Sequence, residues 1–385
     1  MMLKWHLITE SRILVYMGGN AKQRFDEKCV EMIRQILSGR NTLRKVVYRE
    51  KDPKMYHRLV HTVVENYELL VSIVKKSNYM NEDLEMAVVR CYQILDGKLK
   101  NARMKRKFVE LMGGAKLKFT RQPVFVRINT LRGGCESDMN AFVYEKTPLD
   151  GVFKVMNPEV LNGSEAYNEG KIVIQNISSC LPTFILNPEE GSIVIDTCSA
   201  PGNKTSHLSM VMRNTGKIHA FEKDESRAKV LRAQLEKLGV RNAVVIEDDF
   251  LQSVPESFGD VEYILCDPSC SGSGMHLNYK MDSERVNKLK QFQICMVKHA
   301  LQFNPKRLVY SVCSEHREEG DDVVEEVLKD SRYQLEDISQ LWTQNAMSES
   351  PVSKYIIRCK KGTDGATGFF IASFVRKHED ESKIA

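Results

Sequence analysis

Apolar residues in the first hundred positions recur every three or four residues, which is the spacing of one face of a helix. One such face runs from Leu59 to Val74, and a second runs from Leu84 to Leu95. We expect Asn81 to cap the start of the second helix and Gly97 to end it, because short polar residues and glycine are favoured at these positions. Cys91 falls on the apolar face and is predicted to be a core residue. This part of the chain is therefore predicted to be a helical bundle.

From Gly191 onward, short apolar runs alternate with amphipathic segments. The runs that predict strands cover 191–196, 217–224, 242–249, 261–268 and 307–314. The segments that predict helices between them cover 204–212, 226–239 and 286–301. Strands that alternate with helices in this way predict a parallel, doubly wound α/β sheet. We expect a late strand over 368–377 to lie antiparallel at the edge of this sheet.

Two more runs, over 123–132 and 171–182, come before this sheet and are rich in β-branched and apolar residues. They predict strands of a smaller α/β region. The chain has 385 residues, which is long enough for more than one domain. The predicted domains are a basic helical domain over 1–120, a small α/β region over 121–185, the large sheet over 186–378 and a disordered tail over 379–385.

Charge is distributed unevenly along the chain. Hydrophobic residues make up 42% and charged residues 28%, as in a globular protein, and the formal net charge is only +5. Between Lys98 and Arg121, however, nine basic residues stand against one acid, Glu110. Such a segment would bind a polyanion if it folds onto one face. A solvated basic helix and linker would have the same composition.

The ten cysteines include no C-x-x-C pair, and the first residues lack the continuous apolar core of a secretory leader. We therefore expect reduced thiols in an intracellular protein rather than a disulfide framework. A zinc site is not expected, because paired ligands at the required spacing are missing. His57 and His61 are four residues apart, but the glutamate of an H-E-x-x-H motif is absent, so they are interpreted as surface or core residues.

The loops that carry candidate chemistry follow the predicted strands directly. The first, DTCSAPGNKT over 196–205, places small residues before a helix and so favours a ligand against backbone N–H groups. It is not a Walker A loop, because Asn203 precedes Lys204, and it is not G-x-G-x-x-G. Glu222 ends the second strand and could bind ribose hydroxyls. The third strand ends at Asp248-Asp249-Phe250, where a side chain could contact an adenine edge. Together these loops predict an adenosine site without a diphosphate, which indicates S-adenosylmethionine.

Two cysteines come at the ends of the next two strands. Cys270 follows Asp267 in a glycine-rich loop, and Cys313 ends the fifth strand. A thiolate that adds to carbon 6 of a pyrimidine makes carbon 5 able to attack a donor methyl group, and Asp267 could assist at ring N3. The residues alone allow the attacking thiol to be either Cys270 or Cys313.

The segments DTCSAPGNKT, LCDPSCSGSGM, YSVCS and GFFIASFVRK, with QNISSCLP before them, resemble the Nop/Sun family of RNA cytosine-5 methyltransferases. The resemblance covers residues 120 to 377 strongly, and SGSGM after Cys270 is similar to the branch that acts on large-subunit ribosomal RNA. It implies a Rossmann-like class I methyltransferase sheet. It also implies an N-terminal helical domain and a small, RRM-like region that bind RNA.

The resemblance assigns roles residue by residue. It implies that Cys313 is the nucleophile, that Cys270 assists product release, that Asp267 contacts the target base near the donor and that Lys204 supports the reaction centre. The residues that it implies for cofactor binding are Cys198, Ser199, Ala200, Pro201, Gly202, Asn203, Lys204, Glu222, Arg227, Asp249 and Asp267.

Three positions depart from the family pattern. Val312 replaces the usual threonine before the nucleophile, Ser199 replaces a common alanine, and Asn176 stands where the family often has aspartate. None of these changes removes an essential functional group.

The resemblance implies methylation of a cytosine in large-subunit, 28S-type ribosomal RNA by a monomeric enzyme in the nucleolus. No metal is expected because paired ligand spacing is missing, and no membrane association is expected because no apolar stretch approaches the length of a membrane span. Two alternatives stay open from the sequence: the same chemistry on transfer RNA, and a non-catalytic ribosome-assembly factor that keeps the fold and binds RNA.

Overall fold

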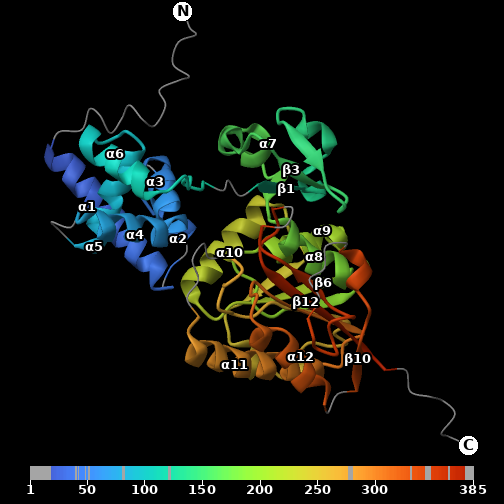
Figure 1. Ribbon diagram of the computed structural model, residues 1–385. Helices are drawn as coiled ribbons and strands as arrows, with labels where there is room; N and C mark the ends of the chain where they lie inside the picture. The colour runs from blue at the N-terminus through green and yellow to red at the C-terminus, as the bar shows by residue number, and fades with distance from the viewer. Residues whose placement is uncertain are drawn as a thin grey trace, which may run out of the picture. The chain divides into compact units, whose positions relative to one another are not determined.

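The computed structural model describes residues 19–377, except for 40, 42, 48, 51–52, 80–82, 120–122, 276–280, 330–331, 343–347 and 363–364. The chain divides into two compact units, one formed by the helices before residue 120 and one formed by the strands and helices after residue 122 (Figure 1). The predicted tail over 379–385 and the first dozen residues lie outside the described residues.

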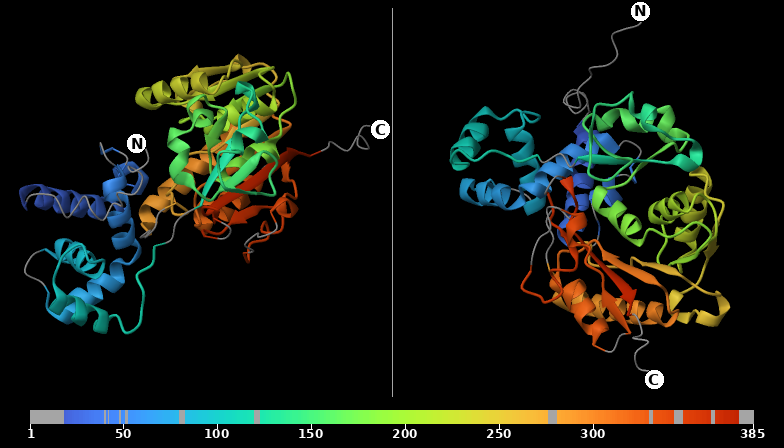
Figure 2. Two further views of the ribbon diagram at one scale, coloured as in Figure 1. Left: turned by 90° about the horizontal axis from the view of Figure 1, so that it is seen from above. Right: turned by 90° about the vertical axis from the view of Figure 1, so that its right-hand side faces the viewer.

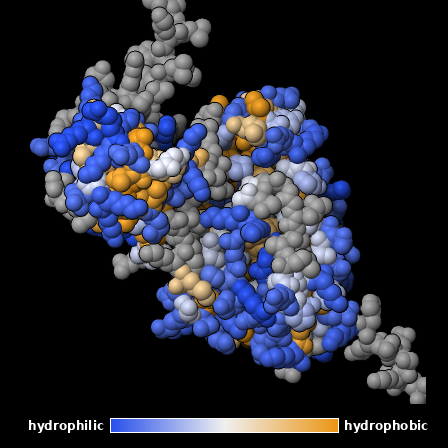
Figure 3. Space-filling model, viewed as in Figure 1, coloured by the Kyte–Doolittle hydropathy of each residue, from blue (hydrophilic) through white to orange (hydrophobic). Residues whose placement is uncertain are grey.

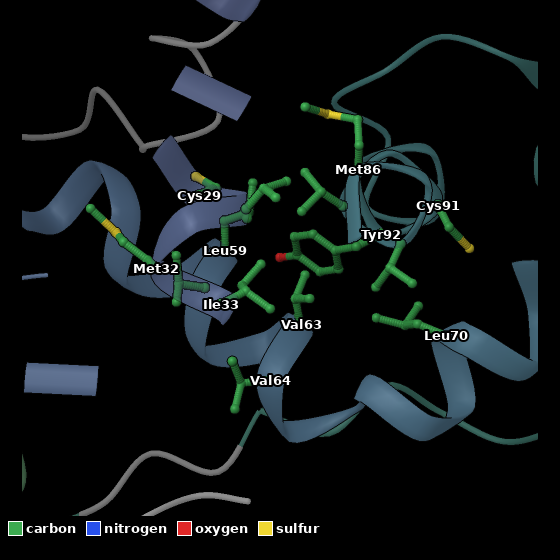
Figure 4. Close-up of a cluster of buried hydrophobic side chains, with 14 of the residues drawn as sticks. Cys29, Met32, Ile33, Leu59, Val63, Val64, Leu70, Met86, Cys91 and Tyr92 are labelled. Atoms are coloured by element: carbon green, nitrogen blue, oxygen red, sulfur yellow. The ribbon is translucent and has the colours of Figure 1, made fainter. Parts of the chain in front are cut away.

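The first unit is a set of helices around one apolar core. Its helices are α1 (Gly19–Leu37), α2 (Leu43–Val47), α3 (Pro53–Glu65), α4 (Tyr67–Ser77), α5 (Leu84–Leu95) and α6 (Ala102–Leu111). Ile33, Val63 and Tyr92 come from three different helices and meet in this core (Figure 4). Cys91 is fully buried, which confirms the prediction of a core cysteine. The predicted helical bundle is therefore present.

The start of α5 differs from the prediction. Its N-cap is Asp83 rather than Asn81, and the Asp83 carboxylate accepts a hydrogen bond from the Met86 backbone N–H at 3.0 Å. Asp83 also pairs with Arg34 of α1 at 3.0 Å, and its negative charge lies at the favourable end of the helix dipole. The predicted end is confirmed, because Gly97 follows α5 with φ +80°.

The second unit begins with a small antiparallel sheet. Its strands are β1 (Val124–Ile128), β2 (Tyr144–Lys146), β3 (Val152–Val155) and β4 (Ile172–Ile174), in the order β2-β3-β1-β4. Short helical segments connect them: η1 (Thr130–Arg132), η2 (Glu136–Met139), η3 (Pro158–Gly163) and α7 (Glu165–Asn168). The buried Asn129 side chain donates to the carbonyls of Gly170 and Leu238 at 2.8 and 2.9 Å, which joins this sheet to the rest of the unit.

The larger sheet carries the predicted parallel strands. They are β5 (Ile193–Asp196), β6 (Lys217–Phe221), β7 (Ala243–Ile246), β8 (Tyr263–Cys266) and β9 (Arg307–Val312), and they are joined by β10 (Tyr333–Leu335), β11 (Ile357–Cys359) and β12 (Phe369–Arg376). The strand order is β10-β12-β9-β8-β5-β6-β7, and the five strands β5 to β9 run parallel.

The late strand β12 is antiparallel to β9, as predicted, but the prediction that it lies at the sheet edge is wrong. Its outer side pairs with β10 from Tyr333 to Leu335 and with β11 from Ile357 to Cys359. Each of these strands has only three residues, so neither has the apolar period that marks a strand in the sequence. The long exposed edge of β12 supplies their hydrogen bonds instead.

Helices cover both faces of the large sheet (Figure 2). They are α8 (Ile177–Leu186), α9 (Asn203–Val211), α10 (Glu225–Lys237), α11 (Ser283–Gln302) and α12 (Asp321–Leu328), with short turns η4 (Phe250–Gln252), η5 (Pro255–Ser257), η6 (Arg317–Glu319) and η7 (Ser339–Leu341). Apolar residues of α11 and α12 pack on one face, and those of α8, α9 and α10 pack on the other. The result is a three-layer α/β unit.

The order in which strands are added to the sheet changes side at β5. From β5 it builds β6 and β7 on one side, and it then returns to build β8 and β9 on the other side. In doubly wound sheets, ligands bind outside the carboxyl ends of the strands at such a reversal. The loops after β5, β8 and β9 meet at this place.

Candidate active site

The two strand-end cysteines lie side by side. Cys313 directly follows β9, and Cys270 lies in the loop after the neighbouring strand β8. Their Sγ atoms are 3.0 Å apart, and both residues are half-buried. The structure therefore brings together the two thiols that the sequence predicted to be close. Their contact is symmetric and fits attack by either sulfur.

The loop that carries Cys270 packs tightly against the backbone around Cys313. The Gly274 N–H donates to the carbonyl oxygen of Cys313 at 3.2 Å, and Gly274 accepts from the Gly368 N–H at 3.1 Å. A Cβ on Gly274 would overlap the carbonyl group of Gly368. Glycine is therefore required here by a close approach of two backbones.

Next to the thiols lies an ion pair between α9 and the loop after β8. Lys204 Nζ is 2.6 Å from Asp267 Oδ2, and the Ser311 hydroxyl donates to Asp267 Oδ1 at 2.8 Å. The ammonium also lies 5.4 Å from the centre of the Phe369 ring. Burial alone would lower the pKa of Lys204, but Asp267, through its charge and hydrogen bond, and the nearby Cys313 together raise it. Lys204 is therefore a persistent cation beside the cysteine pair.

The Cys270 thiol is held in its protonated form. Its pKa is raised well above the ordinary value, first by the hydrogen bond with Cys313, then by burial and by the charges of Cys313 and Glu319. Burial also raises the pKa of Cys198, to about 12, so this thiol in the loop after β5 is unreactive near neutral pH.

The loop from Asp196 to Lys204 is fixed by hydrogen bonds from inside. The Ser199 N–H donates to the Phe221 carbonyl at 2.9 Å, and the Ser199 hydroxyl donates to the Asp196 carbonyl at 2.9 Å. The Thr205 hydroxyl donates to Asp196 Oδ2 at 2.7 Å. Gly202 adopts φ +109° directly before α9, a backbone conformation that favours glycine. The loop is therefore a rigid turn at a helix N-terminus.

The acid at the end of β6 is buried. Glu222 is only 4% exposed; its Oε1 accepts from the Asp224 N–H at 3.0 Å and its Oε2 lies 3.1 Å from Arg227. Arg227 also donates to the carbonyl of Ala200 at 3.2 Å, so it connects this acid to the loop after β5. Because a carboxylate has about four acceptor sites, Glu222 can still bind hydroxyl groups of a ligand.

Asp249 lies after β7 and caps the short turn η4, where its Oδ1 accepts from the Leu251 N–H at 3.1 Å. Its Oδ2 is 3.6 Å from Lys223 Nζ. Carboxylates at the ends of β6 and β7 and a turn rich in small residues after β5 suit a nucleoside with hydroxyl groups and an amino-acid tail.

Sequence reasoning missed three residues that touch these groups. Ser311 is two positions before Cys313, so strand alternation places both on one face and could have found it. Phe369 begins β12 and lies beneath Lys204. Glu319 is fully buried within an acidic run that looks like a solvated helix face, and only the structure distinguishes it from its neighbours.

In the first unit, the basic segment is largely exposed. Arg103, Lys105, Arg106 and Lys107 of α6 are all exposed, while Phe108 is fully buried and anchors the helix to the core. On the face shown in Figure 3, hydrophilic residues surround an apolar patch on this unit. The cations of α6 are therefore available to a polyanion.

Residues 183–375 match the family of 16S rRNA methyltransferases RsmB/F. The chain belongs to this family. This confirms the resemblance to the Nop/Sun methyltransferases that the motifs predicted. The matched residues of this chain include every strand of the large sheet from β5 to β11 and nearly all of β12.

Relatives of this RsmB/F member include the 28S rRNA (cytosine-C(5))-methyltransferase of Mus musculus, which is 35% identical over 66% of this chain and 62% of its own length. The 26S rRNA (cytosine-C(5))-methyltransferase nsun-5 of Caenorhabditis elegans is 32% identical over 67% of this chain and 69% of its own length. The chain thus spans less than two thirds of the mouse protein.

A solved structure of a methyltransferase homologue from Pyrococcus horikoshii superimposes with a TM-score of 0.61 and 26% identity, covering 80% of this chain and 99% of that one. This confirms the predicted class I methyltransferase fold. In the described part of the RsmB/F chain, no helix has the length and apolar character needed to span a membrane. Among the same residues, no cluster of side chains has the make-up of a metal site.

Proposed function

We propose that this protein transfers a methyl group from S-adenosylmethionine to carbon 5 of a cytosine in large-subunit, 28S-type ribosomal RNA. The single observation that carries the proposal is the pair of thiols 3.0 Å apart beside the Lys204–Asp267 ion pair. Membership of an rRNA methyltransferase family and the names of the mouse and nematode relatives support the substrate.

Cys313 is the nucleophile in this proposal. Its thiolate adds to carbon 6 of the cytosine, which forms a sulfur–carbon bond and moves the electron pair of the C5–C6 double bond onto carbon 5. After carbon 5 has gained the methyl group, its proton passes to water or to an ionised Cys270. The C–H electron pair then restores the C5–C6 double bond, and the C6–S bond breaks, which expels Cys313 as a thiolate. Cys270, whose sulfur touches that of Cys313, assists this release.

Lys204 and Asp267 organise the base. The ammonium favours negative charge on Cys313, because the two groups attract each other electrostatically. Asp267 receives hydrogen bonds from Lys204 and Ser311 and is placed at the strand end beside the thiols, where it contacts the polar edge of the cytosine.

The residues at the ends of β5, β6 and β7 fit the methyl donor. Glu222 and Asp249 would hold the nucleoside, Arg227 would fix Glu222 against the loop, and the turn from Cys198 to Lys204 would surround the amino-acid tail. When bound, S-adenosylmethionine supplies an electrophilic methyl group on a sulfonium sulfur.

The RNA must present an unstacked cytosine, because a thiol at the bottom of a strand-end site has no access to a base within a helix. The exposed cations of α6 and the small sheet β2-β3-β1-β4 bind flanking phosphates and nucleotides in this proposal. A ribosomal substrate places the protein in ribosome biogenesis, and we propose the nucleolus as its compartment and a monomer as its active form.

The proposal is tested with recombinant protein, labelled methyl donor and fragments of 28S-type rRNA. Cys313→Ala should abolish methyl transfer, by at least about a thousandfold, since the covalent step is lost while donor binding remains. Cys270→Ala should accumulate a protein–RNA adduct that survives a denaturing gel. Wild-type protein is the control for both.

Three outcomes would contradict parts of this proposal. An adduct that accumulates with Cys313→Ala would reverse the roles of the two cysteines. RNA binding without methyl incorporation would favour a non-catalytic assembly factor. Methylation of transfer RNA in preference to the rRNA fragment, read by bisulfite sequencing of both pools with and without the protein, would replace the substrate.

A further inference from the structure

Glu319 differs from the other acids of the run that follows Cys313. Glu315 is exposed, whereas the Glu319 side chain is at 0% exposure and points back from η6 into the unit. A carboxylate is rarely buried so completely unless it is bound on several sides.

The Glu319 carboxylate holds the residue that follows each cysteine. Its Oε1 accepts from the Ser271 N–H at 2.8 Å, and its Oε2 accepts from the Ser314 hydroxyl at 2.6 Å. Gln293 of α11 donates to Oε1 at 3.0 Å and also to the carbonyl of Ser269 at 3.1 Å, so the same network reaches both sides of Cys270.

The backbone of Glu319 is fixed as well. The Tyr310 hydroxyl donates to its carbonyl oxygen at 2.6 Å, and the following Gly320 packs so closely on Phe370 that a Cβ would overlap the ring. The carboxylate therefore has little freedom to move away from the two loops.

The charge of Glu319 acts on Cys270 and raises the pKa of its thiol. Its hydrogen-bond donors Ser271, Gln293 and Ser314 are all neutral, so the negative charge is stabilised by dipoles and is not cancelled by a cation among them. The titratable groups that raise the pKa of Cys270 are Cys313 and Glu319, and Cys270 in turn raises the pKa of Tyr310.

Cys313 has the opposite environment, because the ammonium of Lys204, paired with Asp267, attracts a negative charge on its sulfur. Glu319 opposes a negative charge on Cys270, and Lys204 attracts one on Cys313, so together they favour one distribution of the proton between two sulfurs in contact.

We propose that Glu319 is a positioning residue that fixes the two cysteine loops at contact distance and keeps the proton on Cys270, so that Cys313 is the sulfur that ionises. The inference deepens the proposed methyl transfer and rests on it for its purpose. The arrangement leaves Cys270 as a neutral S–H donor to the Cys313 thiolate before the base arrives.

The same arrangement gives Cys270 a change of state during the reaction. Once Cys313 is bonded to carbon 6, its sulfur is an uncharged thioether. The hydrogen bond to a Cys313 thiolate, which is the largest contribution to the raised pKa of Cys270, is then lost. Cys270 then gives up its proton more readily, which suits a residue that assists release.

The test measures thiol ionisation directly and needs neither RNA nor methyl donor. The full chain is alkylated with iodoacetamide across a range of pH, and the modification of Cys270 and Cys313 is followed by peptide mass spectrometry. Glu319→Gln keeps the shape of the side chain and removes its charge. The pH midpoint for alkylation of Cys270 should therefore fall by at least one pH unit, so that Cys270 is alkylated about tenfold faster below that midpoint.

Two matched variants separate charge from position. Glu318→Gln removes the neighbouring carboxylate and should leave both midpoints unchanged. Glu319→Asp keeps the charge but shortens the side chain by one methylene, so the midpoint for Cys270 should stay as in the wild type. Its methyl-transfer rate should fall about tenfold, because the two loops are no longer held together.

Equal midpoints for Glu319→Gln and wild type would overturn the proposal, as would an equal shift with Glu318→Gln. If Glu319→Gln does not fold, the wild type still decides, because ionisation of Cys270 before Cys313 contradicts the proposed proton distribution. Failure of the proposed function would appear as absent methyl transfer with the alkylation profile intact, so the two failures are distinguishable.

Discussion

Burial changes the pKa of single side chains in this site. Asp196, at the end of β5, is 1% exposed, and desolvation raises its pKa from 3.8 to about 6, although the Thr205 hydroxyl opposes the shift. Between these values the folded chain binds more protons than the unfolded chain, so the free energy of unfolding decreases as the pH rises.

Asp196→Asn removes this titration. We expect the free energy of unfolding of the wild type, relative to this variant, to fall by about 2 to 3 kcal/mol between pH 4 and pH 7. Chemical denaturation of both proteins at several pH values measures it. Asp337→Asn is the control: hydrogen bonds from Ser339 lower the pKa of Asp337 from 3.8, so its contribution is lost only as the pH falls below that value and should change little between pH 4 and pH 7. Parallel profiles for wild type and Asp196→Asn would contradict the prediction.

Ser311 allows a second test at this scale. Ser311→Ala leaves Asp267 Oδ1 without its hydroxyl donor, which costs about 1 kcal/mol, and we expect methyl transfer to fall about fivefold. Ser373→Ala breaks an equivalent serine–carboxylate bond to Glu336 at 2.8 Å, away from the thiols. Steady-state rates of both variants on the same RNA measure the effect, and an equal loss in both would argue against a role for Ser311 in the site.

At the scale of elements, the strands of the large sheet could be predicted because β5, β6, β8 and β9 are mostly apolar and are buried along nearly their whole length. The strands β10, with sequence YQL, and β11, with sequence IRC, could not, because their pairing depends on the free side of β12 rather than on their own residues. The cap of α5 was predicted two positions too early because Asn81, Glu82 and Asp83 are all polar, and the hydrogen bond from the Met86 N–H to Asp83 is visible only in the structure.

The same reasoning explains what could be predicted of the site. Strand order brings the ends of β8 and β9 together, so the pairing of Cys270 with Cys313 follows from two short motifs in the sequence. The position of Glu319 depends on how η6 turns back beneath both loops, and that turn leaves no pattern in an acidic run.

Tight packing between elements gives a prediction at this scale. Gly274→Ala forces apart the loop after β8 and the segment before β12, and we expect it to lower the free energy of unfolding by at least about 2 kcal/mol. Gly163→Ala is the control, since nothing lies within 4 Å of the added methyl group. Denaturation midpoints compare the two, and equal midpoints would show that the loops separate without cost.

For the whole molecule, the uneven distribution of charge matters more than the net charge of +5. The large-sheet unit pairs many of its exposed cations with acids, such as Lys229 with Glu225 and Lys288 with Glu284, both at 2.6 Å. The segment from Lys98 to Arg121 contains one acid only. Affinity for RNA should therefore depend on the first unit and decrease steeply with salt.

The triple change Arg103→Gln, Lys105→Gln and Arg106→Gln tests this dependence. We expect RNA affinity to fall about tenfold or more near 0.1 M salt, and the salt slope to decrease by about 0.7 for each phosphate that the protein no longer neutralises. The control is Lys229→Gln, Lys288→Gln and Lys298→Gln, which removes the same charge from cations that face glutamates. Fluorescence anisotropy with a labelled fragment measures both, and equal weakening would contradict the prediction.

The pairing of β12 with β9 has a consequence for how the protein is made. Phe370 to Val375 pair with β9, the strand that Cys313 follows. The Gly368 N–H donates to the Gly274 carbonyl in the loop of Cys270. A nascent polypeptide that has emerged only as far as α12 already contains both thiols and the strand-end carboxylates Glu222 and Asp249. It still lacks the strand that pairs with β9, so the site is held together only after β12 has also emerged.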